Sequence, residues 1–418
     1  MARVVAIIAT LDTKAAEAAE LARLIRAGGH EPRVVDVGLR APGDADVRAE
    51  EVAAAAGTTL AQLRDGARRD EAMQALGEGA GRVLARLHAA GELGGAIGIG
   101  GNQGSAIAGV ALRALPLGVP KLIVSTVASG DVRSYVGDGD VAMLFSVGDL
   151  MGGPNAVTAP VLANAAAAIC GMASAYHEAP PDSAARTVAL TAFGNTHAAA
   201  ERAMARLRER DLHVVPFHAS GACGSAMERL VDEGVIHAVL DLTTHELLAE
   251  LYPEDLYAPV RPGRLTAAAR WGVPQVVAPG GLEYFCFGPS ETVPERLRER
   301  PTHHHNPYNL NVRASAEELE RVGAELAGRL NGARGPCAVL IPLRGWSEVG
   351  SPGGVLHDPQ ANAALVERLR AGLRPDIPLI ELDTTINEPR FADRAADALA
   401  EMLEEQPMSR EETSYAWS

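Results

Sequence analysis

Lysine is nearly absent from this sequence of 418 residues, in which only Lys14 and Lys121 occur. Acidic residues outnumber basic ones, 53 to 38, and the formal net charge is −15. Surfaces that bind nucleic acid or anionic membranes need clustered positive charge. The composition therefore predicts neither nucleic acid nor a membrane as a partner.

Cysteines are also few. The four residues Cys170, Cys223, Cys286 and Cys337 lie far apart and form no C-x-x-C pair. This spacing is typical of free thiols in a reducing compartment, and it predicts neither a disulfide framework nor a zinc site. We expect no apolar run of transmembrane length, and the N-terminus enters a strand-like segment without a basic signal region. We therefore expect a cytoplasmic protein.

The sequence does contain alternating strand and helix patterns. An apolar run at 4–9 predicts a buried strand, a helix pattern follows to residue 27, and a second strand is expected at 33–37. Strand, helix and strand joined by short connections form a βαβ unit, which implies a parallel sheet. After an alanine-rich helical insertion at about 41–92, further strands are predicted at 96–99, 121–124 and 141–145.

The pattern begins again near residue 183. Residues 186–196 resemble the first strand and its turn, and Gly118-Val119-Pro120 before one strand is matched by Gly272-Val273-Pro274 before another. We predict an α/β protein of two Rossmann-like domains, 1–182 and 183–418, with mainly parallel sheets flanked by helices and an internal duplication of the architecture. The alternative is a pair of unrelated α/β domains.

A glycine-rich corner follows the predicted strand at 96–99. It consists of Gly100, Gly101, Asn102, Gln103, Gly104 and Ser105. Glycine lets the backbone approach a ligand, and the N–H groups at the start of the next helix suit a phosphate. The corner lacks the lysine of a Walker A loop and does not match the dinucleotide fingerprint. The alternative is a turn that needs glycine only for packing.

The second half carries more ionisable residues after its predicted strands. The acid–base or metal candidates are Asp241, Glu283 and His305. The candidates for holding an anion are His218, Ser220, Gly221, Thr243, Asn306 and Arg344. Carboxylates at strand ends can serve as general acids, bases or metal ligands, and they also cap helices. Three consecutive histidines at 303–305 alternate faces on an extended chain, so they cannot all bind one ion comfortably. A single one could act with Asp241 or Glu283. The alternative is a loop whose histidines cap or hydrogen-bond the backbone. The sequence does not identify a metal.

Several of these motifs together resemble one family. They are Thr10-Leu11-Asp12-Thr13-Lys14, 99–105, 120–131, His218-Ala219-Ser220-Gly221, Asp241-Leu242-Thr243-Thr244 and His305-Asn306-Pro307. The family comprises uncharacterised bacterial and plant proteins similar to the ATP-binding N-terminal region of the tomato mosaic virus resistance protein. The resemblance implies two Rossmann-like domains, ATP binding and self-association as dimers. The antiviral role of the plant relative depends on a viral partner and is not transferred to this chain.

The glycine corner and the resemblance together predict that the N-terminal domain binds ATP or a related nucleotide, with Mg²⁺ as a further expectation. The remaining residues predicted to form this site are Asp12, Thr13, Lys14, Ser129, Gly130 and Asp131. Lys14 would balance phosphate charge, and Asp12 or Asp131 would hold a hydroxyl or the Mg²⁺ ion.

Two alternatives remain open. One is a hydrolase or lyase that acts on a small anionic metabolite in the C-terminal domain or between the domains. The other is a dimeric scaffold that a nucleotide stabilises. The sequence does not decide whether the protein is an enzyme.

Overall fold

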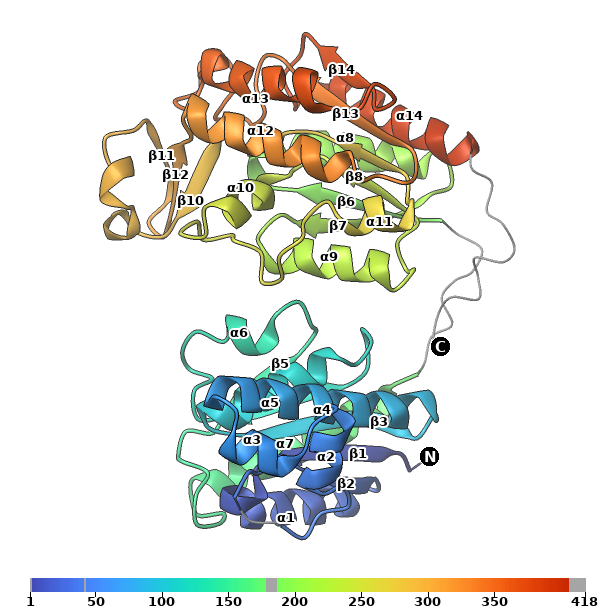
Figure 1. The fold of residues 1–418 in the computed structure, drawn as a ribbon, viewed down its shortest axis with the longest axis vertical. Coiled ribbons are helices and arrows are strands. Elements are labelled where there is room, and N and C mark those ends of the chain that lie inside the picture. The colour runs from blue at the N-terminus through green and yellow to red at the C-terminus, as the bar shows by residue number, and fades with distance from the viewer. Residues whose placement is uncertain (1, 41–42, 178–185, 406–418) are drawn as a thin grey trace. The chain divides into compact units, whose positions relative to one another are not determined.

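The chain divides into two compact units, Met1–Ala179 and Pro180–Ser418, each built around a parallel sheet (Figure 1). The computed structural model describes residues 2–40, 43–177 and 186–405. The predicted domain boundary at 182/183 lies outside these residues. The prediction of an α/β fold with two Rossmann-like domains is confirmed.

The N-terminal unit contains five parallel strands. They are β1 (Val4–Ala9), β2 (Glu31–Asp36), β3 (Leu93–Gly100), β4 (Lys121–Ser125) and β5 (Ala142–Phe145). Their order in the sheet is β2-β1-β3-β4-β5. Chain order reverses between β1 and β3, so this is the topological switch point, where ligands of open α/β sheets bind at the carboxyl ends of the strands.

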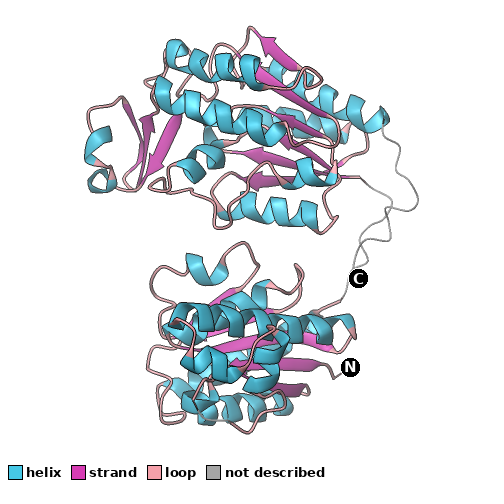
Figure 2. Cartoon of the chain, viewed as in Figure 1, coloured by secondary structure: helices cyan, strands magenta, loops and turns pink. Residues whose placement is uncertain are grey.

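Helices cover both faces of this sheet (Figure 2). They are α1 (Leu11–Ala27), α2 (Ala49–Ala55), α3 (Leu60–Asp65), α4 (Arg69–Ala89), α5 (Asn102–Arg113), α6 (Arg133–Val136) and α7 (Thr158–Ala175). Alternate residues of β1 point to opposite faces of the sheet. Val4 and Ile8 pack in the core formed with α4 and α5. Val5 and Ile7 pack in the core formed with α1 and α7. The insertion predicted at 41–92 contains α2, α3 and α4.

Helix α7 departs from one expectation. Its 18 residues have a mean hydropathy of 1.4, so by length and composition it could span a membrane. The prediction that no apolar run reaches that length was therefore wrong. Leu162, Ala166 and Ile169 on one face of α7 are buried against the sheet, which is the pattern of a core helix.

The C-terminal unit contains six parallel strands. They are β6 (Thr187–Ala192), β7 (His213–His218), β8 (Ala238–Asp241), β9 (Gln275–Val277), β13 (Cys337–Pro342) and β14 (Leu379–Leu382). Their order in the sheet is β7-β6-β8-β9-β13-β14. The first five of these strands repeat the order β2-β1-β3-β4-β5 of the first sheet, and β14 is an additional strand at the end. The two Gly-Val-Pro motifs precede β4 and β9, the fourth parallel strand of each unit. The predicted duplication of the architecture is confirmed.

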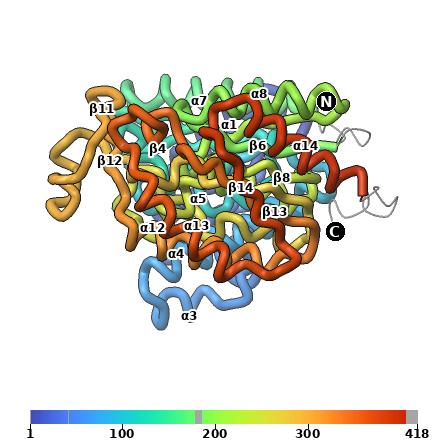
Figure 3. The backbone as a smooth tube through the Cα atoms, turned by 90° about the horizontal axis from the view of Figure 1, so that it is seen from above, coloured from blue at the N-terminus to red at the C-terminus, as the bar shows by residue number. Residues whose placement is uncertain are grey.

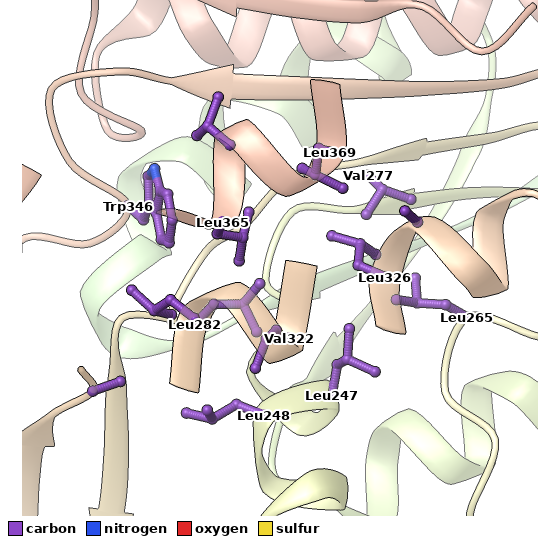
Figure 4. Close-up of a cluster of buried hydrophobic side chains, with 14 of the residues drawn as sticks. Leu247, Leu248, Leu265, Val277, Leu282, Val322, Leu326, Trp346, Leu365 and Leu369 are labelled. Carbon is purple, nitrogen blue, oxygen red and sulfur yellow. The ribbon is translucent and has the colours of Figure 1, made fainter. Parts of the chain in front are cut away.

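Helices also flank the second sheet. They are α8 (His197–Arg208), α9 (Ala222–Asp232), α10 (His245–Leu251), α11 (Ala267–Trp271), α12 (Ala316–Leu330), α13 (Pro359–Gly372) and α14 (Pro389–Glu405). Helices α12 and α13 run side by side (Figure 3). A large apolar core lies between them and the sheet, with Leu326, Trp346 and Leu365 among its side chains (Figure 4).

A small antiparallel sheet, which the sequence did not predict, lies at one end of this unit (Figure 1). Its strands are β10 (Tyr284–Phe287), β11 (Thr302–Asn306) and β12 (Asn309–Arg313), in the order β10-β12-β11. Strand β11 carries His303, His304 and His305, which were expected in a loop because the segment lacks alternating apolar residues. The rings of His303 and His305 lie 6.1 Å apart.

Helices α8 and α14 are linked by ion pairs that should make stability depend on pH. Asp397 Oδ1 accepts hydrogen bonds from Arg206 Nε at 3.0 Å and Arg210 Nη2 at 2.7 Å. Partial burial alone would raise the pKa of Asp397, but the two arginines outweigh it and lower this pKa. A depressed carboxyl pKa stabilises the fold above the unfolded pKa, and that stabilisation is lost as pH falls through the folded value.

We expect Asp397→Asn to lower the free energy of unfolding by about 0.5–1 kcal/mol at pH 7, because the pair is partly exposed to solvent. Urea unfolding at several pH values measures this effect. The difference from wild type should shrink as pH falls below the ordinary aspartate pKa of about 3.9 and disappear below the lowered pKa of Asp397. Asp376→Asn, at an exposed pair with Arg374, is the control and should change little; a deficit for Asp397→Asn that persists unchanged at low pH contradicts the assignment.

Candidate functional site

The first candidate site lies at the β1/β3 switch point of the N-terminal unit. Helix α5 begins here, directly after β3, with Gly101 as its N-cap and no side chain capping it. The first N–H groups of a helix have no acceptor within the helix. Helix α1 begins at the same sheet edge, after β1, and its backbone departs from helical geometry at Lys14. The edge therefore combines an uncapped helix start with a lysine.

Packing explains some glycines of the corner but not all. A methyl group at Gly98 would collide with Ala108, and one at Gly100 would lie 2.7 Å from Gly104 Cα. At Gly101 the nearest atom to such a group is Thr126 Oγ1, at 3.4 Å, an ordinary contact. The φ angle of Gly101 is −85°, which any residue can adopt. Neither space nor conformation within this domain requires glycine at position 101.

The side chains of the corner are already bonded within the domain. Ser105 is buried, and its Oγ donates to Ser125 Oγ at 2.6 Å. Asn102 Oδ1 accepts from Tyr135 at 3.2 Å. Gln103 Oε1 accepts from Arg69 Nη2 at 2.7 Å, which places an arginine of α4 beside α5. The side-chain oxygens of Asn102, Gln103 and Ser105 therefore have partners within the domain, and the backbone N–H groups at the start of α5 are the donors that the corner offers to a ligand.

The other predicted residues follow β1 and β4, which neighbour β3 in the sheet. Asp12 Oδ2 accepts from Arg40 N at 3.3 Å, and Asp131 Oδ1 accepts from Arg133 N at 2.9 Å. Thr13 is exposed and Lys14 is half-buried. Ser129 and Gly130 are exposed on the loop after β4. The sheet order thus gathers all three segments at one edge.

Lys121, the second lysine, lies at the opposite end of the sheet because it begins β4. Its buried Nζ donates to the carbonyls of Pro116 at 2.6 Å and Val119 at 2.9 Å, and it pairs with Asp140 Oδ1 at 2.5 Å. These bonds anchor the turn before β4. Lys121 therefore belongs to the structure of the domain and not to the candidate site.

In the C-terminal unit, Asp241 is part of a buried ion network. Arg264 Nη2 lies 2.9 Å from Asp241 Oδ2, Nε lies 2.6 Å from Glu246 Oε2 and Nη1 lies 2.5 Å from Glu228 Oε1. Thr191 donates to Asp241 Oδ1 at 2.7 Å. Burial alone would lower the pKa of Arg264, but the three carboxylates raise this pKa well above its usual value. Asp241 already has partners for both carboxylate oxygens, so we interpret it as structural.

The second predicted anion corner is filled by the protein itself. Glu246 Oε1 accepts from the backbone N–H groups of Gly221 and Gly224, the latter at 3.1 Å, at the start of α9. A methyl group at Gly224 would collide with the Glu246 carboxylate. An internal carboxylate thus occupies the position proposed for an external anion at Ser220 and Gly221.

Of the residues predicted in this domain, four are buried and Ser220 is half-buried. The buried ones are Gly221, Asp241, Thr243 and Glu283. Burial raises the pKa of the Glu283 carboxyl, an effect that nearby Ser347 and Arg313 partly offset. Thr243 Oγ1 lies 2.8 Å from Thr196 Oγ1. The exposed residues are His218, His305, Asn306 and Arg344. In the described part of the chain, His305, Asn306 and Arg344 make no hydrogen bond or ion pair with Asp241 or Glu283.

The switch point of the second sheet lies between β6 and β8, and it holds a cluster that the sequence did not single out. His245 is the first residue of α10, the helix that follows β8, and its Nε2 lies 3.2 Å from Asp255 Oδ1. The potential ligand atoms of His245, Asp255 and Cys286 all lie within 4.8 Å of one another, and all three residues are buried. These residues come from separate elements, so no local spacing could have revealed them.

The fold defines a two-domain α/β protein with a repeated sheet order and a candidate site at the switch point of each sheet. Residues 3–178 match the model of the "Uncharacterised protein family (UPF0261) N-terminal domain", and residues 185–403 match that of the C-terminal domain of the same family. The chain belongs to the UPF0261 family.

The regions that match the relatives cover both domains. A UPF0261 protein of Clostridium tetani is 37% identical, with 97% of this chain and 100% of the relative covered. UPF0261 protein RA0729 of Rhizobium meliloti is 40% identical, with 94% and 97% covered. The ToMV resistance protein Tm-1(GCR237) of Solanum lycopersicum is 35% identical over 76% of this chain and 42% of the tomato protein. The predicted family resemblance is confirmed.

Proposed function

We propose that the N-terminal domain binds ATP or a closely related nucleotide, with its phosphates at the N-terminus of α5. The observation that carries this proposal is Gly101, a glycine at an uncapped helix start that neither packing nor backbone geometry requires. A residue without a side chain at this point leaves room for phosphate oxygens to reach the helix N–H groups. The β1/β3 switch point is where this class of sheet binds nucleotides.

The neighbouring side chains supply the charges that a nucleotide needs. Lys14 would pair with a phosphate, and Asp12 or Asp131 would hold a Mg²⁺ ion or a ribose hydroxyl. Arg69, held beside α5 through Gln103, would add positive charge at the rim. The choice of ATP follows from the family resemblance. We also propose that the protein is cytoplasmic and forms homodimers.

Two substitutions test this site. Lys14→Ala removes the charge, and Gly101→Val fills the space above the helix N-terminus. Since a hydrogen bond to a charged group contributes about 1.5–3 kcal/mol, each should weaken Mg·ATP binding roughly 10- to 100-fold in calorimetric titration. Thermal melts should show both variants folded.

Gly171→Ala, at a glycine of α7 with open space around it, is the matched control and should bind like wild type. Unchanged affinity in both Lys14→Ala and Gly101→Val would reject this site. A nucleotide-hydrolysis assay beside the titration separates the two roles: binding without turnover favours a dimeric scaffold, and turnover favours an ATP-dependent enzyme.

A second candidate function concerns the C-terminal domain. Glu283 is completely buried, and both of its carboxyl oxygens lack a hydrogen-bond partner among the residues the structure describes. Such a group costs free energy unless it has a role. This observation favours a hydrolase or lyase that acts on a small anionic metabolite, with Glu283 as the acid–base group. Turnover that survives Gly101→Val but not Glu283→Gln would support it.

A further inference from the structure

We propose that His245, Asp255 and Cys286 bind a divalent transition-metal ion, Zn²⁺ by the chemistry of their donor atoms. The three side chains converge at the β6/β8 switch point of the C-terminal domain, far from the Gly101 corner in sequence and in a different domain. The proposal is independent of nucleotide binding.

The hydrogen bonds of His245 fix which ring nitrogen is available. Its Nδ1 lies 2.8 Å from the carbonyl oxygen of Gly281, and a carbonyl only accepts, so Nδ1 carries a proton. In a neutral imidazole Nε2 is then an unprotonated acceptor, yet it faces the carboxylate of Asp255 at 3.2 Å. This contact is satisfied either by a second proton on Nε2, which makes the ring an imidazolium, or by a metal ion in the place of that proton. Metal-bound histidines typically donate their other N–H to a backbone carbonyl in this way.

The other two ligands are also oriented by surrounding donors. The backbone N–H of Cys286 donates to Asp255 Oδ2 at 2.7 Å, and that of Tyr257 donates to Oδ1 at 2.8 Å. Asn311 Nδ2 donates to Cys286 Sγ at 3.2 Å, which orients the sulfur. Asn311 is buried on β12. Such outer contacts hold ligands in place before the metal arrives.

Charge and donor type select the metal. A divalent ion with one carboxylate, one thiolate and one neutral imidazole gives a net charge of zero, as a buried site requires. Nitrogen and sulfur donors disfavour Mg²⁺ and Ca²⁺, which prefer oxygen, and suit Zn²⁺. The three side chains thus supply a mixed set of nitrogen, oxygen and sulfur donor atoms, of the kind that zinc accepts.

Three protein ligands leave a fourth position, which is the arrangement of catalytic rather than structural zinc sites. The rings of Phe193 and Tyr284 lie 5.0 and 5.6 Å from that of His245. Half-buried Tyr257 has its ring 6.0 Å from His245, and exposed His218 packs on Phe193 at 5.1 Å. These residues connect the buried cluster with the surface. A zinc-bound water here would have aromatic walls.

The test is a zinc titration of the reduced full chain against a competing chelator, with bound metal measured by mass spectrometry. Wild type should bind one buried equivalent. His245→Asn keeps a donor for the Gly281 carbonyl but loses Nε2, and Cys286→Ser loses the sulfur; both should lose this equivalent. Asn311→Leu should weaken binding about 10- to 100-fold, as loss of an outer contact does.

Two controls exclude other thiols and imidazoles. Cys337→Ser, at another buried thiol, and the triple replacement of His303, His304 and His305 by Asn should both retain the equivalent. In wild type, Co²⁺ should show sulfur-to-cobalt charge-transfer absorption, a readout that holds even if a variant fails to fold. Loss of zinc in the triple histidine variant, retention in His245→Asn and Cys286→Ser, or a wild-type chain that binds neither metal would overturn the proposal.

Discussion

Replacing Arg264 with Met is expected to lower the free energy of unfolding by about 3–5 kcal/mol, because it leaves buried carboxylates without their counter-charge. Arg264 is 1% exposed and pairs with Glu228, Asp241 and Glu246. Methionine fills most of the space, so the loss measures charge rather than volume. Chemical unfolding monitored by circular dichroism gives the value.

The same experiment has a clear control and a pH signature. Arg368→Met, at a surface arginine 3.9 Å from Glu320, should cost less than about 0.5 kcal/mol. The deficit of Arg264→Met should shrink as pH falls, because burial already raises the pKa of Glu228 and the loss of Arg264 raises this pKa further, so that the carboxyl takes up a proton. A deficit equal to that of Arg368→Met would show that the network does not hold the sheet edge together.

Replacing Trp346 with Ala is expected to cost a similar amount, about 3–5 kcal/mol, through the cavity it leaves. Trp346 follows β13, is 1% exposed and packs with Leu282 and Leu365 in the core of the C-terminal unit (Figure 4). It joins the carboxyl edge of the sheet to the α12–α13 layer. The midpoint of thermal unfolding should fall accordingly.

Trp271→Ala is the matched control for this substitution. Trp271 is 60% exposed and donates from Nε1 to Asp232 at 2.9 Å. Its loss should cost roughly 1 kcal/mol or less, since only a surface hydrogen bond and little buried area are removed. Equal losses for the two tryptophans would contradict the role given to Trp346.

The parallel strands could be predicted because buried strands appear as short apolar runs with helices between them. Val4–Ala9 was predicted with its observed bounds, and the Gly-Val-Pro repeat correctly paired β4 with β9. Strand β11 could not be predicted in this way. Its histidines carry no alternating apolar signal, and it forms through pairing with β12.

The candidate sites also differ in whether neighbouring or distant parts of the sequence form them. The Gly101 corner is visible in sequence because one strand and the next helix create it. The His245 cluster was invisible because three distant segments supply it. The sequence also could not show that Glu246 fills the start of α9, or that Arg264 neutralises Asp241, since both depend on how side chains meet across the fold.

Hydrogen exchange of the full chain with and without Mg·ATP tests the central claim most directly, because it locates a bound nucleotide. The account predicts slower exchange in peptides that cover 10–14 and 101–105, with Gly101→Val abolishing the effect. Protection confined to the C-terminal domain, or none at saturating Mg·ATP, would contradict nucleotide binding at the β1/β3 switch point.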